Sequence, residues 1–237
     1  MFVVSRTNKG LVRDNNEDSI LVKLPNLFVI ADGMGGHQGG ETASSEAVNY
    51  LASTDFSNVD DKNILPFLSK KVQEVSSRIW QMAQENQQLR GMGTTLTAVY
   101  LLGDERACVA HVGDSRVYLL QSNGLKKITR DHSYVAELVR NKEISPEEAA
   151  NHLHKNIIMR AVGAEPYVEV DSFEFLTSGA KRMLLSSDGL TNMVSEEEIE
   201  NILQDSSLTF AADTLMSKAL AAGGKDNISF IILDLED

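Results

Sequence analysis

The sequence has little cysteine, and it lacks any long apolar run. Its 237 residues include a single cysteine, Cys108, so no disulfide can form within the chain, which is typical of proteins of a reducing compartment. No segment approaches the roughly 18 consecutive apolar residues of a membrane-spanning helix. The first residues also lack the pattern of a signal peptide. These absences predict a cytoplasmic protein that has no membrane-embedded segment.

Basic residues are also scarce relative to acidic ones. Lys and Arg total 22 against 34 Asp and Glu, so the formal net charge is −12. A surface of this sign repels nucleic acid and anionic membranes, and neither is expected as a partner. No pattern sets the oligomeric state, and a monomer is the default expectation. A protein this acidic that handled phosphate groups would need bound cations.

Strand-like segments come in runs and helix-like segments in pairs, without an alternating βαβ order. Tight connections at 103–105 and 122–124 predict an antiparallel sheet through the four strands between 95 and 128. The pattern favours an α+β fold of antiparallel sheets covered by helices, in one domain over residues 1–237. A polar excursion at about 131–156 is interpreted as a flap. The predicted strands are 2–5, 19–24, 27–31, 95–102, 106–112, 116–121, 125–128, 168–176, 182–186 and 228–235, and the predicted helices are 40–53, 63–89, 195–203 and 208–221.

Four apolar strands each meet an aspartate at one end. Asp32, Asp114 and Asp188 follow strands, and Asp226 precedes the last one. A single Asp-Gly or Asp-Asn pair is a common turn and carries little weight. Clustered carboxylates, however, cannot all stay ionised without compensating positive charge. Mg²⁺ and Mn²⁺ prefer oxygen ligands, so the four acids predict a metal centre if the fold brings them together.

The glycine-rich segment that follows Asp32 resembles a phosphate-binding loop. From Gly35 it fits the P-loop spacing, but Glu41 stands where that motif needs lysine. Two acids in this segment would repel bare phosphate. The glycines instead let the backbone approach closely, so that a carbonyl such as that of Gly33 can serve as a metal ligand.

Arg13 lies in an acidic loop between the first two predicted strands. Its paired N–H donors suit a phosphate dianion, although a surface loop arginine is the alternative. Glu17 and Asp18 follow as a candidate metal ligand and a holder of metal-bound water, or as plain loop acids.

Other catalytic schemes do not fit these residues. A cysteine phosphatase needs arginine six positions after its cysteine, where this chain has Asp114. There is no Gly-x-Ser-x-Gly segment and no HExxH pair among the five histidines. Hydrolysis by a metal-activated water remains.

Seven short motifs, in this order along nearly the whole chain, resemble the bacterial metal-dependent protein phosphatases of type 2C. The resemblance implies a four-layer α-β-β-α sandwich with two antiparallel sheets and a binuclear Mn²⁺ or Mg²⁺ centre. The motifs are Arg13-x-x-Asn-Glu-Asp18, Val29-Ile-Ala-Asp-Gly-Met-Gly-Gly-His37, Gly93-Thr-Thr95, Gly113-Asp-Ser-Arg116, Asp131-His-Ser133, Ser187-Asp-Gly189 and Gly224-Lys-Asp-Asn227.

The resemblance also implies roles for the metal-site residues. Asp32 would bridge both metals, and Gly33 would offer its carbonyl. Asp188 and Asp226 would hold one metal. Asp114 matches a position that, together with Asp188, binds a third metal in bacterial members.

Further roles follow from the same resemblance. Glu17 or Asp18 would order water around the other metal, and Arg13 matches the phosphate-binding arginine. Met34 stands where animal members carry a histidine thought to protonate the leaving group, so His37 becomes the candidate acid.

The segment after Asp131-His-Ser133 matches the family's flap, which lies beside the site. Leu153 replaces a common proline there.

The substrates implied by the resemblance are phosphoserine and phosphothreonine proteins, including a partner serine/threonine kinase and its targets. Three alternatives stay open. In the first, the same centre hydrolyses small phosphate esters. In the second, the chain binds phosphoproteins without catalysis, although every expected acid is present. A regulatory phosphatase with a built-in sensor is the third, but no extra domain is available to sense anything.

Overall fold

Eleven strands of the described residues form two antiparallel sheets in the computed structural model, which describes residues 1–35, 39–103, 105–205 and 207–235. The five-stranded sheet has the order β1 (Val3–Asn8), β11 (Ile228–Asp234), β10 (Ala180–Ser186), β7 (Arg116–Gln121), β8 (Gly124–Lys127). The six-stranded sheet has the order β2 (Asp18–Lys23), β3 (Leu27–Met34), β5 (Leu96–Leu101), β6 (Arg106–Val112), β9 (Asp171–Leu176), and β4 (Gly93–Thr94) pairs with β3.

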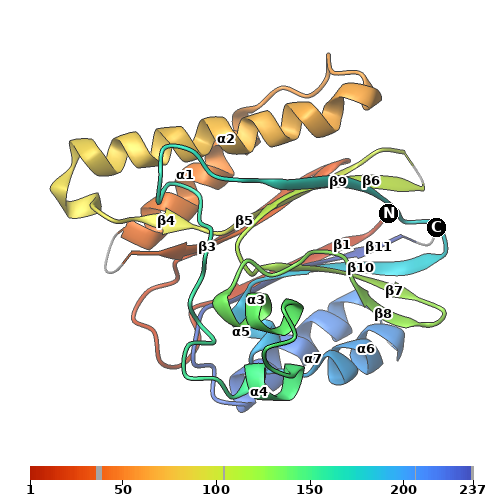
Figure 1. Cartoon of the computed structure of the whole chain (residues 1–237). Coiled ribbons are helices and arrows are strands. Elements are labelled where there is room, and N and C mark those ends of the chain that lie inside the picture. The colour runs from red at the N-terminus through yellow and green to blue at the C-terminus, as the bar shows by residue number, and fades with distance from the viewer. Residues whose placement is uncertain (36–38, 104, 206, 236–237) are drawn as a thin grey trace.

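Helices cover the outer face of each sheet, so that Figure 1 shows four layers from top to bottom. The upper pair is α1 (Gly39–Ser53) and α2 (Asp61–Glu85), and the lower pair is α6 (Glu196–Asp205) and α7 (Leu208–Ala221). The shorter elements are η1 (Gln87–Leu89), α3 (Tyr134–Arg140), α4 (Pro146–Ala150) and α5 (Asp188–Thr191). The predicted four-layer α+β sandwich is confirmed. No helix in the described part of the chain combines the length and apolarity needed to cross a membrane.

Three apolar cores separate the four layers, because strands of both sheets are apolar on both faces. In β3, Val29 and Ala31 pack into the core beneath α1 and α2, whereas Phe28 and Ile30 point into the core between the sheets. The third core lies between the five-stranded sheet and helices α6 and α7. Successive side chains of a strand point to opposite faces, so a strand that is covered on both sides is apolar throughout.

The sequence predicted one sheet through the four strands between 95 and 128, and this prediction is wrong. β5 pairs with β6 and β7 pairs with β8, both antiparallel, but the two hairpins belong to different sheets. The chain changes sheets at Gly113, whose φ of +111° is in the left-handed region that favours glycine. The short connections therefore predicted the two hairpins correctly, but the prediction that both hairpins belong to one sheet was wrong.

Two acids predicted at strand ends lie inside regular elements. β3 continues to Met34, so Asp32 and Gly33 are strand residues that pair with β2 and β4 respectively. Asp188 opens the short helix α5, which the sequence did not reveal because four residues show no helical period. The predicted strand at 168–176 begins only at Asp171.

The predicted helix starts at Ser145 and Ser195 are confirmed. Ser145 and Glu148 form a reciprocal capping box ahead of α4, and Ser195 accepts a bond from the backbone of Glu198 at 3.3 Å. The segment at about 131–156 contains α3 and α4.

Candidate functional site

Asp18 and Asp32 face each other across the β2–β3 pair; Asp18 is buried and Asp32 is half-buried. One Asp18 oxygen, Oδ2, accepts a 2.9 Å bond from the Ser187 hydroxyl, whereas the buried Oδ1 has no hydrogen-bond partner. Burial raises the pKa of Asp18 to about 7, and the charges of Asp188 and Asp226 add to the rise. Like charges placed directly opposite each other in a sheet are unfavourable, so this pair calls for a compensating cation.

The backbone of Asp32 is fixed by Thr94 of β4 and by Thr95, which lies between β4 and β5. Its N–H donates to Thr95 Oγ1 at 2.9 Å, and its carbonyl accepts from Thr95 N at 2.8 Å and Thr94 Oγ1 at 2.9 Å. Burial raises the pKa of the Asp32 carboxyl well above its usual value, and Asp18 and Asp188 raise it further.

Asp188 joins the same cluster from the first turn of α5. Its carboxyl lies close to that of Asp32, and Oδ2 accepts from Asn192 Nδ2 at 2.9 Å. Burial is the main cause of its raised pKa, and Asp226 adds to it. The backbone of α5 at Gly189 lies so close to Asn227 that a Cβ on Gly189 would collide with the Asn227 carbonyl.

Asp114 lies in the turn that carries the chain from β6 to β7. Its pKa is raised to about 7 by burial, with Asp188 and Asp131 adding to the shift and Arg116 opposing it. Asp114 therefore belongs to the cluster electrostatically through Asp188. The four predicted acids and Asp18 thus form one electrostatically coupled cluster.

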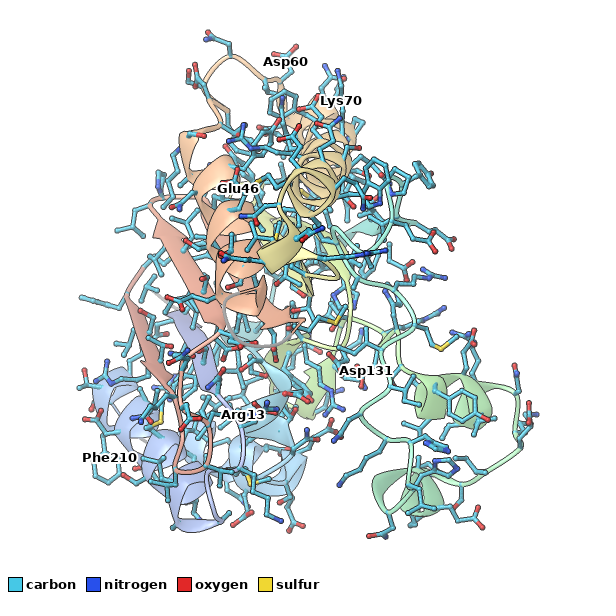
Figure 2. All side chains as sticks on the ribbon, turned by 90° about the vertical axis from the view of Figure 1, so that its left-hand side faces the viewer. Arg13, Glu46, Asp60, Lys70, Asp131 and Phe210 are labelled. Atoms are coloured by element: carbon cyan, nitrogen blue, oxygen red, sulfur yellow. The ribbon has the colours of Figure 1, made fainter. Side chains whose placement is uncertain are left out.

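Arg13 lies at the edge of this cluster, near the lower centre of Figure 2. Its Nη2 donates to Asp226 Oδ2 at 2.9 Å, and this bond raises the pKa of Arg13, with Glu17 and Asp32 contributing. The side chain is 55% exposed. Its guanidinium therefore faces both the acids and the solvent.

Glu17 is held through its backbone next to the first turn of α1. Its N–H donates to Asn227 Oδ1 at 2.8 Å, and its carbonyl accepts from Gly33 N at 3.1 Å. Gly40 leaves room for the Glu17 carboxylate, since a Cβ there would collide with Oε2. A Cβ on Gly33 would in turn collide with the Gly40 carbonyl, so the predicted close backbone approach at Gly33 is confirmed.

His37, the candidate acid, lies outside the described residues. The supporting role of Asn227 was not predicted from the sequence. Its amide donates to the carbonyls of Lys9 at 3.0 Å and Asn15 at 2.8 Å. Asn227 stands in a motif that was recognised, but only the acid beside it was given a role. An Asp-Asn pair ahead of a buried strand was the available signal.

Within the described ranges, no three acidic, histidine or cysteine side chains already surround one point as a ready metal-ligand set. Arg13 occupies one oxygen of Asp226, and Asn192 occupies one oxygen of Asp188. Binding an ion would replace such contacts.

The sequence over residues 6–222 matches the family described as Protein phosphatase 2C. This chain belongs to that family. Serine/threonine phosphatase stp of Listeria welshimeri is 43% identical to it, over 99% of this chain and 96% of the relative. The predicted family and the predicted enzyme class, a protein phosphatase, are confirmed.

Solved structures of family members agree with the fold. Staphylococcus aureus serine/threonine phosphatase Stp1 superposes with a TM-score of 0.92 at 34% identity, over 99% of this chain and 95% of that one. The catalytic domain of PstP in complex with two manganese ions gives a TM-score of 0.89 at 38% identity, over 98% of this chain and 97% of that one. This 2C-type phosphatase thus has the sandwich of its relatives.

Proposed function

We propose that this 2C-type phosphatase removes phosphate from phosphoserine and phosphothreonine in proteins, using two Mn²⁺ or Mg²⁺ ions bound among its buried aspartates. The observation that carries the proposal is the convergence of five carboxyls at one place. Burial raises the pKa of four of them, Asp18, Asp32, Asp114 and Asp188, and the charges of neighbouring acids raise it further. Such a cluster is costly unless cations neutralise it. The five are Asp18, Asp32, Asp114, Asp188 and Asp226.

The residues present fit a hard divalent ion. The donors are carboxylate oxygens and backbone carbonyls, which Mn²⁺ and Mg²⁺ prefer. Asp18 Oδ1 is buried without a partner, a position that an ion or its water shell would satisfy. The two manganese ions bound by the PstP catalytic domain support the same assignment.

The proposed ligands are those suggested by the motifs. Asp32 would contact both ions, the carbonyl of Gly33 would contribute to the site, and Asp188 and Asp226 would hold one ion. We further propose that Asp18, with Glu17, orders water around the other ion, and that Asp114 and Asp188 hold a third.

When bound, the ions would supply a water whose pKa falls from about 15.7 toward about 7, so that it can lose its proton at neutral pH. Arg13 would bind the phosphate oxygens with its paired donors, exchanging its contact with Asp226 for one with substrate. His37 would protonate the departing serine or threonine oxygen.

The wider parts of the proposal rest on sequence. The chain would act as a monomeric cytoplasmic domain over residues 1–237, with residues 131–156 as a flap beside the site. Its phosphoprotein substrates would include a partner serine/threonine kinase. Neither nucleic acid nor membrane is proposed as a partner, since the net charge is −12.

The test is release of phosphate from a phosphothreonine peptide with Mn²⁺, with chelator, and by Asp32→Ala in Mn²⁺. Asp60→Ala is the matched control, because Asp60 is an exposed residue before α2 whose side chain makes no cap bond. We expect activity from the original protein and the control in Mn²⁺ only. Turnover in chelator would remove the proposed mechanism. Faster turnover of nucleotides than of phosphopeptides would favour small phosphate esters as substrates.

A further inference from the structure

Both backbone polar groups of Gly113 are bonded to one residue, His132. The Gly113 N–H donates to His132 Nδ1 at 3.1 Å, and the Gly113 carbonyl accepts from His132 N at 2.8 Å. Gly113 directly precedes Asp114, and its positive φ turns the chain out of β6. A Cβ at Gly113 would lie 2.6 Å from the Thr95 side chain. The turn is therefore fixed by contacts on two sides.

The hydrogen bonds define where the His132 proton sits. Because Nδ1 accepts from an N–H, the proton of the neutral ring is on Nε2, which lies 3.2 Å from Asp171 Oδ2. Arg160 Nη1 in turn donates to Asp171 Oδ1 at 2.9 Å. The ring of His132 is buried, and that of His111 packs on it at 4.8 Å between centroids.

His132 also joins this turn to the segment that carries α3 and α4. Its carbonyl accepts from Met159 N at 2.7 Å, so the chain leaving the segment returns to the same residue. Asp131, the preceding residue, pairs with Arg116 Nη2 at 2.7 Å. Figure 2 shows Asp131 between the body of the molecule and this segment. One residue thus anchors the segment and the Asp114 turn together.

We propose that His132 is a positioning residue, whose Nδ1 acceptor holds the Gly113 backbone so that Asp114 is presented to Asp188. The proposal rests on the proposed function, in which these two acids bind an ion. It assigns the effect to one hydrogen-bond acceptor and not to the bulk of the ring.

Two substitutions distinguish the loss of the hydrogen-bond acceptor at His132 from the loss of the ring's volume. In His132→Asn, the amide oxygen can take the place of Nδ1 and accept from Gly113. In His132→Gln, the polar end of the side chain reaches the Nε2 position and leaves Gly113 without an acceptor. The two variants are similar in size and polarity, so each is the control for the other.

The first measurement is hydrogen exchange of the Gly113 amide in the metal-free protein. We expect the original protein and His132→Asn to exchange alike, and His132→Gln to exchange on the order of fivefold faster, as loss of one neutral hydrogen bond implies. The second is Mn²⁺ binding by calorimetry. Here we expect His132→Gln to bind one ion about tenfold more weakly, as for removal of a group that supports a metal ligand, and His132→Asn to change little.

Equal impairment of both variants would overturn the proposal, because it would assign the effect to the ring's bulk. Mn²⁺ affinity unchanged in His132→Gln would overturn it as well. If neither variant folds, ¹⁵N NMR of the imidazole in the unmodified protein decides: an unprotonated Nδ1 is expected, and a protonated one overturns the proposal. Absence of phosphatase activity in the original protein would count against the proposed function alone, since these measurements need no turnover.

Discussion

Arg13 and Asp226 are separated by 213 residues in the sequence, and they form an ion pair of 2.9 Å at the edge of the aspartate cluster. Both side chains are partly exposed, at 55% and 35%, so the pair contributes little to stability. Its effect is on position, because it holds a guanidinium where an incoming phosphate would meet the acids.

Arg13→Ala should therefore impair substrate binding more than folding. We expect kcat/KM for a phosphothreonine peptide to fall about 10- to 100-fold, mainly through KM, since charge-assisted hydrogen bonds to the phosphate are lost. Steady-state kinetics at saturating Mn²⁺ would measure this.

Arg6→Ala is the matched control, because Arg6 also forms a partly exposed ion pair, with Asp213 at 2.8 Å. We expect its kinetics to match those of the original protein. An unchanged KM for Arg13→Ala would show that Arg13 is only a loop residue.

The metal-free protein should lose stability as pH rises. Asp18 and Asp114 have pKa values of about 7 in the folded chain against 3.8 without the fold, so the native state keeps protons that the unfolded state has lost. The stability that they contribute is present below about pH 4 and is lost as pH rises through about 7. Denaturant unfolding in chelator across this range would measure the decline.

Two comparisons test the origin of that decline. Asp114→Asn removes one of the titrating carboxyls and should make the fall in unfolding free energy shallower. Mn²⁺ should largely abolish the fall, because a bound cation stabilises the ionised acids. A metal-free protein that gained stability between pH 4 and 7 would contradict the buried-acid description.

Gly189→Ala should damage both the fold and the site. The added methyl group would collide with the Asn227 carbonyl and contact Asp226 Cβ at 3.5 Å, so α5 must move away from β11. We expect a loss of about 1–3 kcal/mol of unfolding free energy, together with most of the activity. Gly179→Ala is the control, since its φ of +72° strains alanine although open space surrounds it. It should cost about 1–2 kcal/mol and leave kcat/KM unchanged.

Asn227→Ala should destabilise the loops that carry Arg13 and Glu17. Its side chain makes bonds to the backbones of Glu17, Lys9 and Asn15, and losing three bonds of about 1 kcal/mol each predicts about 3 kcal/mol. Chemical denaturation would measure this. Asn49→Ala loses one exposed bond to Ser45, and its unfolding free energy should change by less than about 0.5 kcal/mol. Equal effects of the two substitutions would refute the structural role of Asn227.

Sequence patterns predicted most elements of the fold, because apolar runs and tight turns are local features. The hairpins β5–β6 and β7–β8 followed from their short connections. Their separation into two sheets did not, since it depends on the left-handed turn at Gly113 and on packing against strands distant in the chain. The four-layer arrangement came from the family resemblance rather than from periodicity.

The acids of the candidate site could be predicted from the sequence, whereas most of the residues that hold those acids in place could not. Asp32, Asp188 and Asp226 stood out because each interrupts or borders an apolar strand. The partners of His132 and Asn227 could not be found from spacing, because their bonds join residues that meet only after folding. Burial of Asp18 likewise depends on the packing of β2 against the opposite sheet, from which Ser187 donates to it.

The bonds from Asn227 to Glu17, Lys9 and Asn15 also bear on how the protein is made. A ribosome synthesises the loop that carries Arg13 more than two hundred residues before it reaches Asn227. Throughout that interval the loop lacks its anchor, and Asp226 is absent. A nascent chain therefore cannot hold the assembled centre until translation has passed residue 227 and that residue has emerged from the exit tunnel.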